Sequence, residues 1–198
     1  MISITNALHQ LAVKKGVAFH FNSPVHRIIN FEGSAKGIVV DEQNIYADVV
    51  VSNADVYFTY KNLLNIKSKA KKVLKQERSS SAVIFYWGIN QNFPQLGLHN
   101  IFFSEQYQQE FQHIFNYKKL YSDPTVYINI TSKEEAGHAP QGKENWFVMI
   151  NVPANTGQNW QSFVDAARAN VLQKLGRMLG TDVAALIETE TVLDPILI

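Results

Sequence analysis

The side chains that could support acid–base or metal chemistry are histidines and carboxylates, and they are scattered along the chain. No two of the six histidines are four residues apart, the spacing of a helical zinc motif. Two carboxylate pairs occur, Glu134 with Glu135 and Glu188 with Glu190. The first lies in a polar stretch, which favours solvated side chains over general acid–base catalysis. We therefore predict no metal site, and the pattern assigns no catalytic residue.

The absence of cysteine and of glycine-rich motifs excludes several kinds of chemistry. Without cysteine the chain can form no disulfide, thiolate nucleophile, zinc–thiolate site or iron–sulfur cluster. The sequence has no G-x-G-x-x-G, G-x-S-x-G or H-E-x-x-H, and the Gly-Lys at 142–143 lacks the rest of a phosphate loop. Familiar nucleotide-binding and hydrolase motifs therefore do not explain this chain.

The most informative local feature is a predicted strand-to-helix corner at residues 49–55. Three consecutive valines at 49–51 are typical of a buried strand, and the small residues Ser-Asn-Ala follow them. Asp55 is a suitable N-cap for a helix that continues towards residue 64. Free backbone N–H groups at such a helix start could receive an anionic or polar edge of a ligand.

Hydrophobic periodicity predicts the elements that position this corner. A helix ending near Gly16 is followed by alternating residues that predict a β-meander over residues 17–52. Further along, we predict strands near 82–89, 100–103, 125–131 and 146–152, and a helix that begins near Ser104. The clearest helix covers residues 160–179, with Gly180 as its stop. The predicted fold class is therefore α+β.

Composition points to a folded domain without a nucleic-acid partner. The chain has 198 residues, 46% of them hydrophobic, and a formal net charge of +1, whereas nucleic-acid-binding domains usually carry a marked basic excess. No run approaches the roughly 18 apolar residues of a membrane span, and the first residues do not form a signal peptide. We expect a cytoplasmic protein. Its 12% aromatic residues suit a large apolar ligand, but a plain aromatic core explains them more simply.

Five lysines surround a thin apolar stripe in a helix predicted over residues 67–78. Such a helix could lie on an anionic membrane surface, as an enzyme that takes its substrate from lipid would require. A solvated amphipathic helix with its stripe on the core is the simpler interpretation. The lysines are Lys67, Lys69, Lys71, Lys72 and Lys75.

An ordered set of sequence strings resembles a known family. The strings are ALHQLAVKKGVAFHFNSPVHRII, YADVVVSNADVYFTYKNLL, SSSAVIFYWGIN, LGLHNIFFSEQYQQEFQHIF, DPTVYINITSKEEAGHAPQGKENWFVMINVP and ARANVLQKL. In order and wording they are similar to bacterial carotenoid desaturases of the phytoene desaturase family. That family resembles the wider group of two-dinucleotide-fold flavoproteins that includes amine oxidases. The resemblance covers nearly all 198 residues, and VVSNAD is its most specific string.

The resemblance implies a domain organisation and a cofactor. Full-length members bind FAD through a glycine-rich fingerprint near the N-terminus and a second motif near the C-terminus, and neither is present in this sequence. We therefore expect an internal piece of the enzyme that is inactive alone. Residues 1–55 would be a partial FAD-binding domain that contains the β-meander. Residues 56–198 would be the substrate-binding domain, with a mixed or antiparallel sheet and helices on one face.

The resemblance also implies site residues and a reaction. Val25 would lie beside the adenine of FAD, and Ser52, Asn53 and Ala54 would lie near the cofactor. The reaction would remove a hydride and a proton across a C–C single bond of a carotenoid, with the flavin as electron acceptor. Seven aromatic residues would line or support the substrate domain, although core packing is the default role of each: Phe85, Tyr86, Trp87, Phe102, Phe103, Trp146 and Phe147.

Several alternatives remain open on the sequence alone. A carotenoid isomerase, a ketolase-like oxidase or another amine-oxidase-like flavoprotein would share these strings. A non-catalytic module that binds lipid or a protein partner is a different class, and a purely structural, oligomerising domain is a third. Unpaired strand edges could also pair two copies of the chain into a homodimer.

Overall fold

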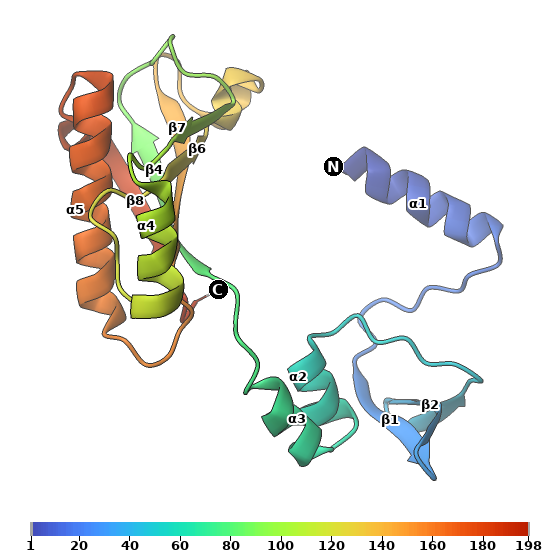
Figure 1. Ribbon diagram of the computed structural model, residues 1–198. Coiled ribbons are helices and arrows are strands. Elements are labelled where there is room, and N and C mark those ends of the chain that lie inside the picture. The colour runs from blue at the N-terminus through green and yellow to red at the C-terminus, as the bar shows by residue number, and fades with distance from the viewer. Residues whose placement is uncertain (1, 198) are drawn as a thin grey trace. The chain divides into compact units, whose positions relative to one another are not determined.

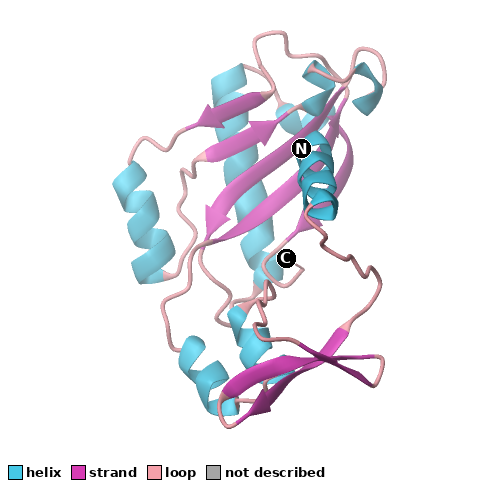
Figure 2. Ribbon diagram, turned by 90° about the vertical axis from the view of Figure 1, so that its right-hand side faces the viewer, coloured by secondary structure: helices cyan, strands magenta, loops and turns pink. Residues whose placement is uncertain are grey.

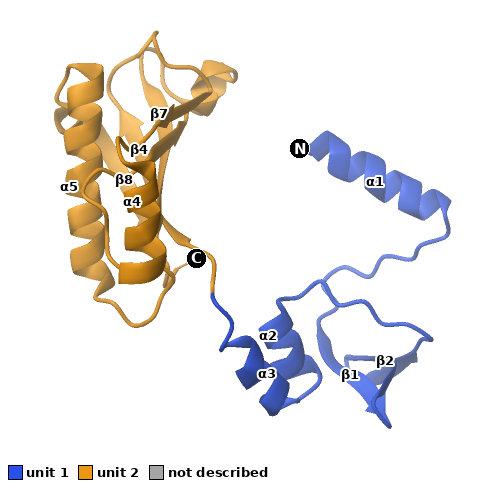
Figure 3. Ribbon diagram, viewed as in Figure 1, with its two compact units in different colours: residues 1–77 blue, residues 78–198 orange. Residues whose placement is uncertain are grey.

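The chain folds into two compact units in the computed structural model, which describes residues 2–197 (Figures 1 and 3). Unit 1 ends at Glu77 and unit 2 begins at Arg78. The sequence placed a domain boundary after residue 55, whereas the helices that follow this residue belong to the same compact unit as the meander. The assignment of an FAD-binding and a substrate-binding domain to these parts of the chain stays a prediction.

Unit 1 contains a three-stranded antiparallel sheet with the order β1-β2-β3, and helices before and after it in the sequence. Its elements are α1 (Ile2–Lys14), β1 (Val25–Phe31), β2 (Ser34–Val40), β3 (Gln43–Tyr46), α2 (Val56–Phe58), a π-helical turn (Thr59–Leu63) and α3 (Lys67–Val73). Two-residue turns join the strands, and all four turn residues have positive φ, as a tight turn matched to the strand twist requires. The predicted meander is thus confirmed for residues 25–46.

Two other predicted strands of unit 1 do not form. Residues 17–21 lie in a turn and an irregular segment, where the rings of Phe19 and Phe21 stack with centroids 5.9 Å apart. Residues 49–51 are also irregular, and the side chains of Val49 and Val51 are 75% and 88% exposed. A strand needs a hydrogen-bonded neighbour, and within residues 2–197 neither segment has one.

Unit 2 contains a five-stranded sheet in which every neighbouring pair is antiparallel, with the order β5-β6-β7-β4-β8. Its elements are β4 (Ser81–Ile89), β5 (His99–Phe102), α4 (Tyr107–Gln112), a π-helical turn (His113–Tyr117), β6 (Val126–Asn129), 3-10 turns (Thr131–Lys133 and Ala136–His138), β7 (Glu144–Val152), α5 (Trp160–Leu179), a 3-10 turn (Val183–Leu186) and β8 (Ile187–Leu193). The α+β class and the antiparallel sheet are therefore confirmed.

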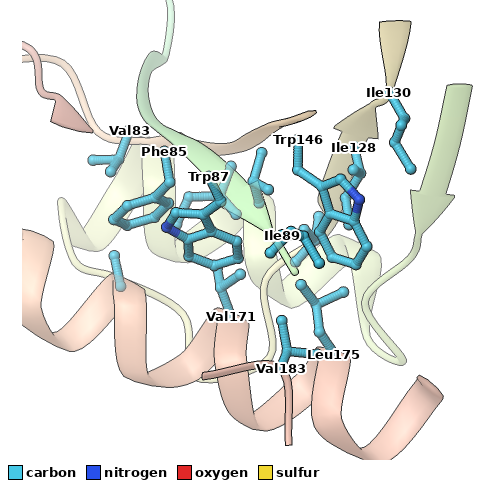
Figure 4. Close-up of a cluster of buried hydrophobic side chains, with 14 of the residues drawn as sticks. Val83, Phe85, Trp87, Ile89, Ile128, Ile130, Trp146, Val171, Leu175 and Val183 are labelled. Atoms are coloured by element: carbon cyan, nitrogen blue, oxygen red, sulfur yellow. The ribbon is translucent and has the colours of Figure 1, made fainter. Parts of the chain in front are cut away.

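The hydrophobic core of unit 2 lies between this sheet and α5, which runs along one face of the sheet (Figure 2). Alternate residues of β4 and β7 are buried, so each strand turns one set of side chains towards the helix. Phe85 and Trp87 from β4 meet Val171 and Leu175 from α5 in this layer (Figure 4). Gly180 ends α5 in a left-handed conformation, as the sequence predicts.

A buried lysine ties the loops of unit 2 to α5. Lys174 is 4% exposed, and its Nζ donates to Asp123 Oδ1 at 2.9 Å and to the carbonyl oxygens of Phe103 and Pro124 at 2.7 and 2.9 Å. The Asp123 carboxylate in turn accepts the backbone N–H of Glu105 at 2.8 Å. A buried ammonium is tolerated only where acceptors surround it in this way, so these contacts fix the segment around α4.

Candidate functional site

A cavity of about 630 Å³ in unit 1 brings together the four residues that the resemblance assigned to the cofactor. Val25 at the start of β1 lines it, as do Ser52, Asn53 and Ala54 in the segment between β3 and α2. The sequence separates Val25 from the other three by more than 25 residues, and the meander is what closes this distance. Whether these residues bind a cofactor stays a prediction.

The walls of this cavity are largely apolar. Side chains of Ile28, Ile38 and Ile45 come from the three strands, and Phe58 and Leu63 come from α2 and the π-helical turn. The polar lining groups are uncharged serine and asparagine side chains, and no described residue of the lining is charged. Such a lining suits a flat, uncharged ring system and offers no cation to a diphosphate.

The corner beside the cavity is held by its own hydrogen bonds. The hydroxyl groups of Ser52 and Thr59 lie 2.8 Å apart and join the segment to the π-helical turn. Asp55 caps α2, because its Oδ1 accepts the N–H groups of Tyr57 at 2.8 Å and Phe58 at 3.4 Å. The Asp55 carboxylate therefore occupies two of the N–H groups at this helix start, and the expectation that a ligand edge is received here stays a prediction.

Sequence reasoning missed the contribution of the π-helical turn to the cavity. Asn62 and Leu63 line the cavity from this turn. The sequence predicts a helix that continues towards residue 64, but it does not single out Asn62 as a site residue. A π-helical turn rotates side chains relative to an α-helix, and no residue pattern in the sequence indicates such a turn.

Unit 2 offers a second candidate surface, the open face, which we define as the side of its sheet opposite α5. Tyr86 and Phe147 lie side by side on this face with ring centroids 5.4 Å apart, and Tyr127 is 6.2 Å from Phe147. Tyr86 is 43% exposed, so the aromatic surface is accessible to a ligand. A cavity of about 580 Å³ lies at one end of the open face.

The seven aromatic residues predicted for the substrate domain divide between the two faces of the sheet. Tyr86 and Phe147 lie on the open face. The other five are distributed between core and surface: Phe85, Trp87 and Trp146 are buried against α5, Phe102 packs partly buried against the core, and Phe103 is exposed. A uniformly apolar strand such as β4 does not reveal which of its residues face the helix until the register is known.

Two kinds of feature are absent from the part of the chain that the structure describes. Residues 2–197 contain no group of three or more histidine, aspartate or glutamate side chains close enough to hold a metal ion. Within the same residues, no helix has both the length and the apolar character needed to cross a membrane.

Comparison with known proteins relates this chain to carotenoid enzymes. It is 52% identical over 98% of its length to a 1-hydroxycarotenoid 3,4-desaturase of Flavobacterium sp.. It is 31% identical over 97% of its length to a phytoene desaturase of Fusarium fujikuroi, and 34% identical over 97% to a 4,4'-diaponeurosporene oxygenase of Staphylococcus aureus. The chain matches a segment of the phytoene desaturase family. It spans 38% to 40% of the length of these three curated relatives.

Comparison at the level of family models and of solved structures adds the fold. No protein-family model matches the chain. The crystal structure of an oxidoreductase from Methanosarcina mazei matches 94% of the chain with a TM-score of 0.57, and the chain covers 40% of that structure. The two sequences are 15% identical, so this likeness concerns the fold alone.

Proposed function

We propose that this chain contributes the substrate-binding sheet and part of the flavin-binding unit to an FAD-dependent enzyme that desaturates phytoene or a related carotenoid. The observation that carries the proposal is the 52% identity to a 1-hydroxycarotenoid 3,4-desaturase over 98% of the chain. Similarity of this degree along both units argues for a shared role and not only for a shared fold.

The unit 1 cavity fits a part of FAD. Its apolar walls and its uncharged polar groups at Ser52, Asn53 and Asn62 would hold a ring of the cofactor, with Val25 at the strand end beside it. Bound FAD would supply the electron-accepting chemistry of the reaction. No described residue of the lining carries a positive charge to pair with the diphosphate, so we assign only a ring-binding role to this chain.

The open face of unit 2 would hold and orient the carotenoid. A polyene is a flat, apolar rod, and the Tyr86 and Phe147 rings give it an extended surface from which water is displaced. Strand register continues this surface to Ile84 and Met149, which pair directly across β4 and β7. In this proposal the sheet positions the substrate and excludes water, and no residue of the chain is assigned as a base.

A chimaeric enzyme tests the proposed function directly. Residues 1–198 would replace the matching segment of the Flavobacterium relative, and the product would be identified by its absorption spectrum and mass. We expect desaturation, which lengthens the conjugated system and moves its absorption to longer wavelength. A folded, flavin-loaded chimaera without this product would refute the proposal. Because one relative is named an oxygenase, the mass must also distinguish loss of hydrogen from gain of oxygen.

A variant of the same chimaera tests the flavin-binding role of unit 1. Ala54→Phe places a ring in the cavity that we assign to FAD, and we expect the ratio of bound flavin to protein to fall at least fivefold. Gln43→Phe is the matched control, because Gln43 is exposed on β3 and does not line the cavity. Equal flavin content in the two variants would contradict the assignment.

Peripheral membrane contact through α3 is a further part of the proposal, as is a cytoplasmic location. All five lysines of the segment are exposed, and Lys69 also lies over the Tyr60 ring at 5.4 Å. Co-sedimentation of the chain with vesicles of phosphatidylcholine alone or with added phosphatidylglycerol tests it. We expect binding only to the anionic vesicles, with loss in 0.5 M salt. Binding that persists after Lys71→Glu and Lys72→Glu would count against this helix.

Homodimer formation through strand edges is the last part of the proposal. β5 and β8 are the two edge strands of the unit 2 sheet, and each presents unpaired backbone groups. Light scattering after size-exclusion chromatography measures the mass. We expect the parent chain to be a dimer and Thr191→Pro in β8 to be a monomer. A monomeric parent chain would rule this assembly out.

A further inference from the structure

The open face of unit 2 changes from polar to apolar along its strands. Three neighbouring residues in register, Asn145, Gly88 and Thr189, form the row at one end. The next row is mixed, because the Phe147 and Tyr86 rings lie between Asn129 and Thr191. The row after that is apolar and consists of Met149, Ile84 and Leu193. The cavity of about 580 Å³ lies over the polar end of this gradient.

Hydrogen bonds hold a histidine at the edge of this cavity. Thr131 Oγ1 accepts a bond from Asn145 Nδ2 at 2.7 Å and lies 2.9 Å from His138 Nδ1, to which it is also hydrogen-bonded. Asn145 Oδ1 accepts the N–H of Ser132 at 2.9 Å, so the amide orientation is fixed. In the tautomer with the proton on Nε2, Thr131 donates to His138 Nδ1 and the imidazole offers its Nε2 proton to a ligand.

Gly88 provides the space in the floor of the cavity. A Cβ atom at this position would come within 2.5 Å of Thr189 Oγ1. The missing side chain therefore lets the Thr189 hydroxyl lie over β4, where it is exposed and lines the cavity together with Asn145 and His138. A hydroxyl ligand entering here finds both a donor and an acceptor.

The available groups fit a neutral polar ligand and not a charged one. Glu144 is the single carboxylate residue among the described lining residues, and it is 3% exposed. Its oxygens accept bonds from the Phe93 N–H at 2.8 Å and from Trp146 Nε1 at 2.7 Å, and they pair with Lys133. This carboxylate is thus already satisfied, which leaves the hydroxyl, amide and imidazole groups to meet a ligand.

We propose that this cavity binds the terminal hydroxyl of a hydroxylated carotenoid whose hydrocarbon chain lies on the apolar rows of the open face. This inference rests on the proposed function, and it names the substrate class and the residues that select it. A hydrocarbon end in the cavity would displace the water that is hydrogen-bonded to His138, Asn145 and Thr189. It has no polar group to replace those hydrogen bonds, so its binding would be weaker. One well-placed hydrogen bond corresponds to a preference of about tenfold for the hydroxylated ligand.

The test compares two ligands on the full chain. A 1-hydroxycarotenoid and the carotenoid of the same skeleton without the hydroxyl are titrated in detergent solution, and the quenching of tryptophan fluorescence gives each Kd. We expect the hydroxylated ligand to bind about tenfold more tightly to the parent chain. His138→Leu should reduce this preference to less than twofold while the affinity for the hydrocarbon stays the same. His113→Leu is the matched control, since His113 lies on the turn after α4, outside the cavity.

A second variant distinguishes loss of the hydroxyl site from misfolding of the chain. Gly88→Ala must displace the Thr189 hydroxyl, and its preference should fall at least threefold with an unchanged circular dichroism spectrum. Equal Kd values for the two ligands on the parent chain would overturn the hydroxyl site and leave the proposed carotenoid function intact. Failure of both ligands to bind would overturn both proposals. An unchanged preference in His138→Leu and Gly88→Ala would also refute the site.

Discussion

Asp123 illustrates how one residue couples stability to pH. Burial alone raises the pKa of the Asp123 carboxyl, but the Glu105 N–H, the hydrogen bond and charge of Lys174 and the charge of Arg177 outweigh it and lower that pKa below its usual value near 3.8. A carboxylate whose pKa is lowered in the folded state stabilises the fold at pH values above its pKa in the unfolded chain. That contribution is lost as the pH falls from about 4 through the folded pKa.

Asp123→Asn should therefore destabilise unit 2 at pH 7 by about 2 kcal/mol, because Lys174 keeps two carbonyl acceptors but loses its counter-charge. The difference from the parent chain should shrink as the pH falls from about 4 towards the lowered folded-state pKa of Asp123, where the parent carboxylate itself becomes protonated. Urea titrations at pH 7 and pH 3 measure both values. Glu105→Gln is the control: its carboxylate is 81% exposed and 3.9 Å from Arg177, so little change is expected. A pH-independent difference would contradict the linkage.

Single residues of the two sites differed in how far the sequence could predict them. Val25, Ser52 and Asn53 could be assigned because a family resemblance supplied their positions, and the structure brings them into one cavity. Asn62 and His138 could not be assigned from the sequence. The position of Asn62 depends on a π-helical turn, and that of His138 depends on hydrogen bonds that link its 3-10 turn through Thr131 to β7. Such contacts join residues whose spacing in the sequence carries no periodic signal.

The sequence predicts a helix or strand well where interactions between residues near in the sequence stabilise it. The periodicity of α5 and the glycine at its end suffice for this helix, and Asn159 caps its start by accepting the Ser162 N–H at 3.3 Å. The predicted strands at 17–21 and 49–51 failed for a different reason. Side-chain alternation describes a strand's preference, but the strand exists only where a partner supplies hydrogen bonds, and the described chain has none for these segments.

The end of α5 gives a prediction at this scale. Gly180 has φ of 68°, and its N–H donates to the Gly176 carbonyl, which closes the helix. Gly180→Ala should cost about 1 kcal/mol because a Cβ disfavours this left-handed conformation. Gly97→Ala is the matched control, since no positive φ is found there and no atom lies within 4 Å of the added Cβ. Thermal denaturation of both variants measures the difference, and equal melting temperatures would contradict this view of the helix end.

At the scale of the whole molecule, buried apolar residues are divided unequally between the two units. Within residues 2–197, the buried hydrophobic side chains of unit 1 are Ile28 and Ala70, and the others belong to unit 2. Along α1 no residue is buried, and Ile4, Leu8 and Leu11 are more than half exposed. Hydrophobic burial is the main favourable term in folding, so the units should differ widely in stability.

We therefore predict two separate unfolding transitions in a urea titration of the full chain. Unit 1 should lose its structure first, at low urea, because little buried apolar surface stabilises it, and its transition should be shallow. Unit 2 should follow in a cooperative transition reported by the fluorescence of its buried Trp87 and Trp146, while circular dichroism reports both steps. Limited proteolysis should cut first near residues 74–79, where the chain is exposed between the units.

We expect two transitions because the chain divides into two compact units and the buried hydrophobic residues are divided unequally between them. A ligand of the unit 1 cavity would move only the first transition to higher urea, and a ligand of the open face only the second, by mass action on the folded state. FAD and a 1-hydroxycarotenoid are the two probes. A single transition that both probes shift equally would mean that the units fold as one body, and would contradict the division at Glu77.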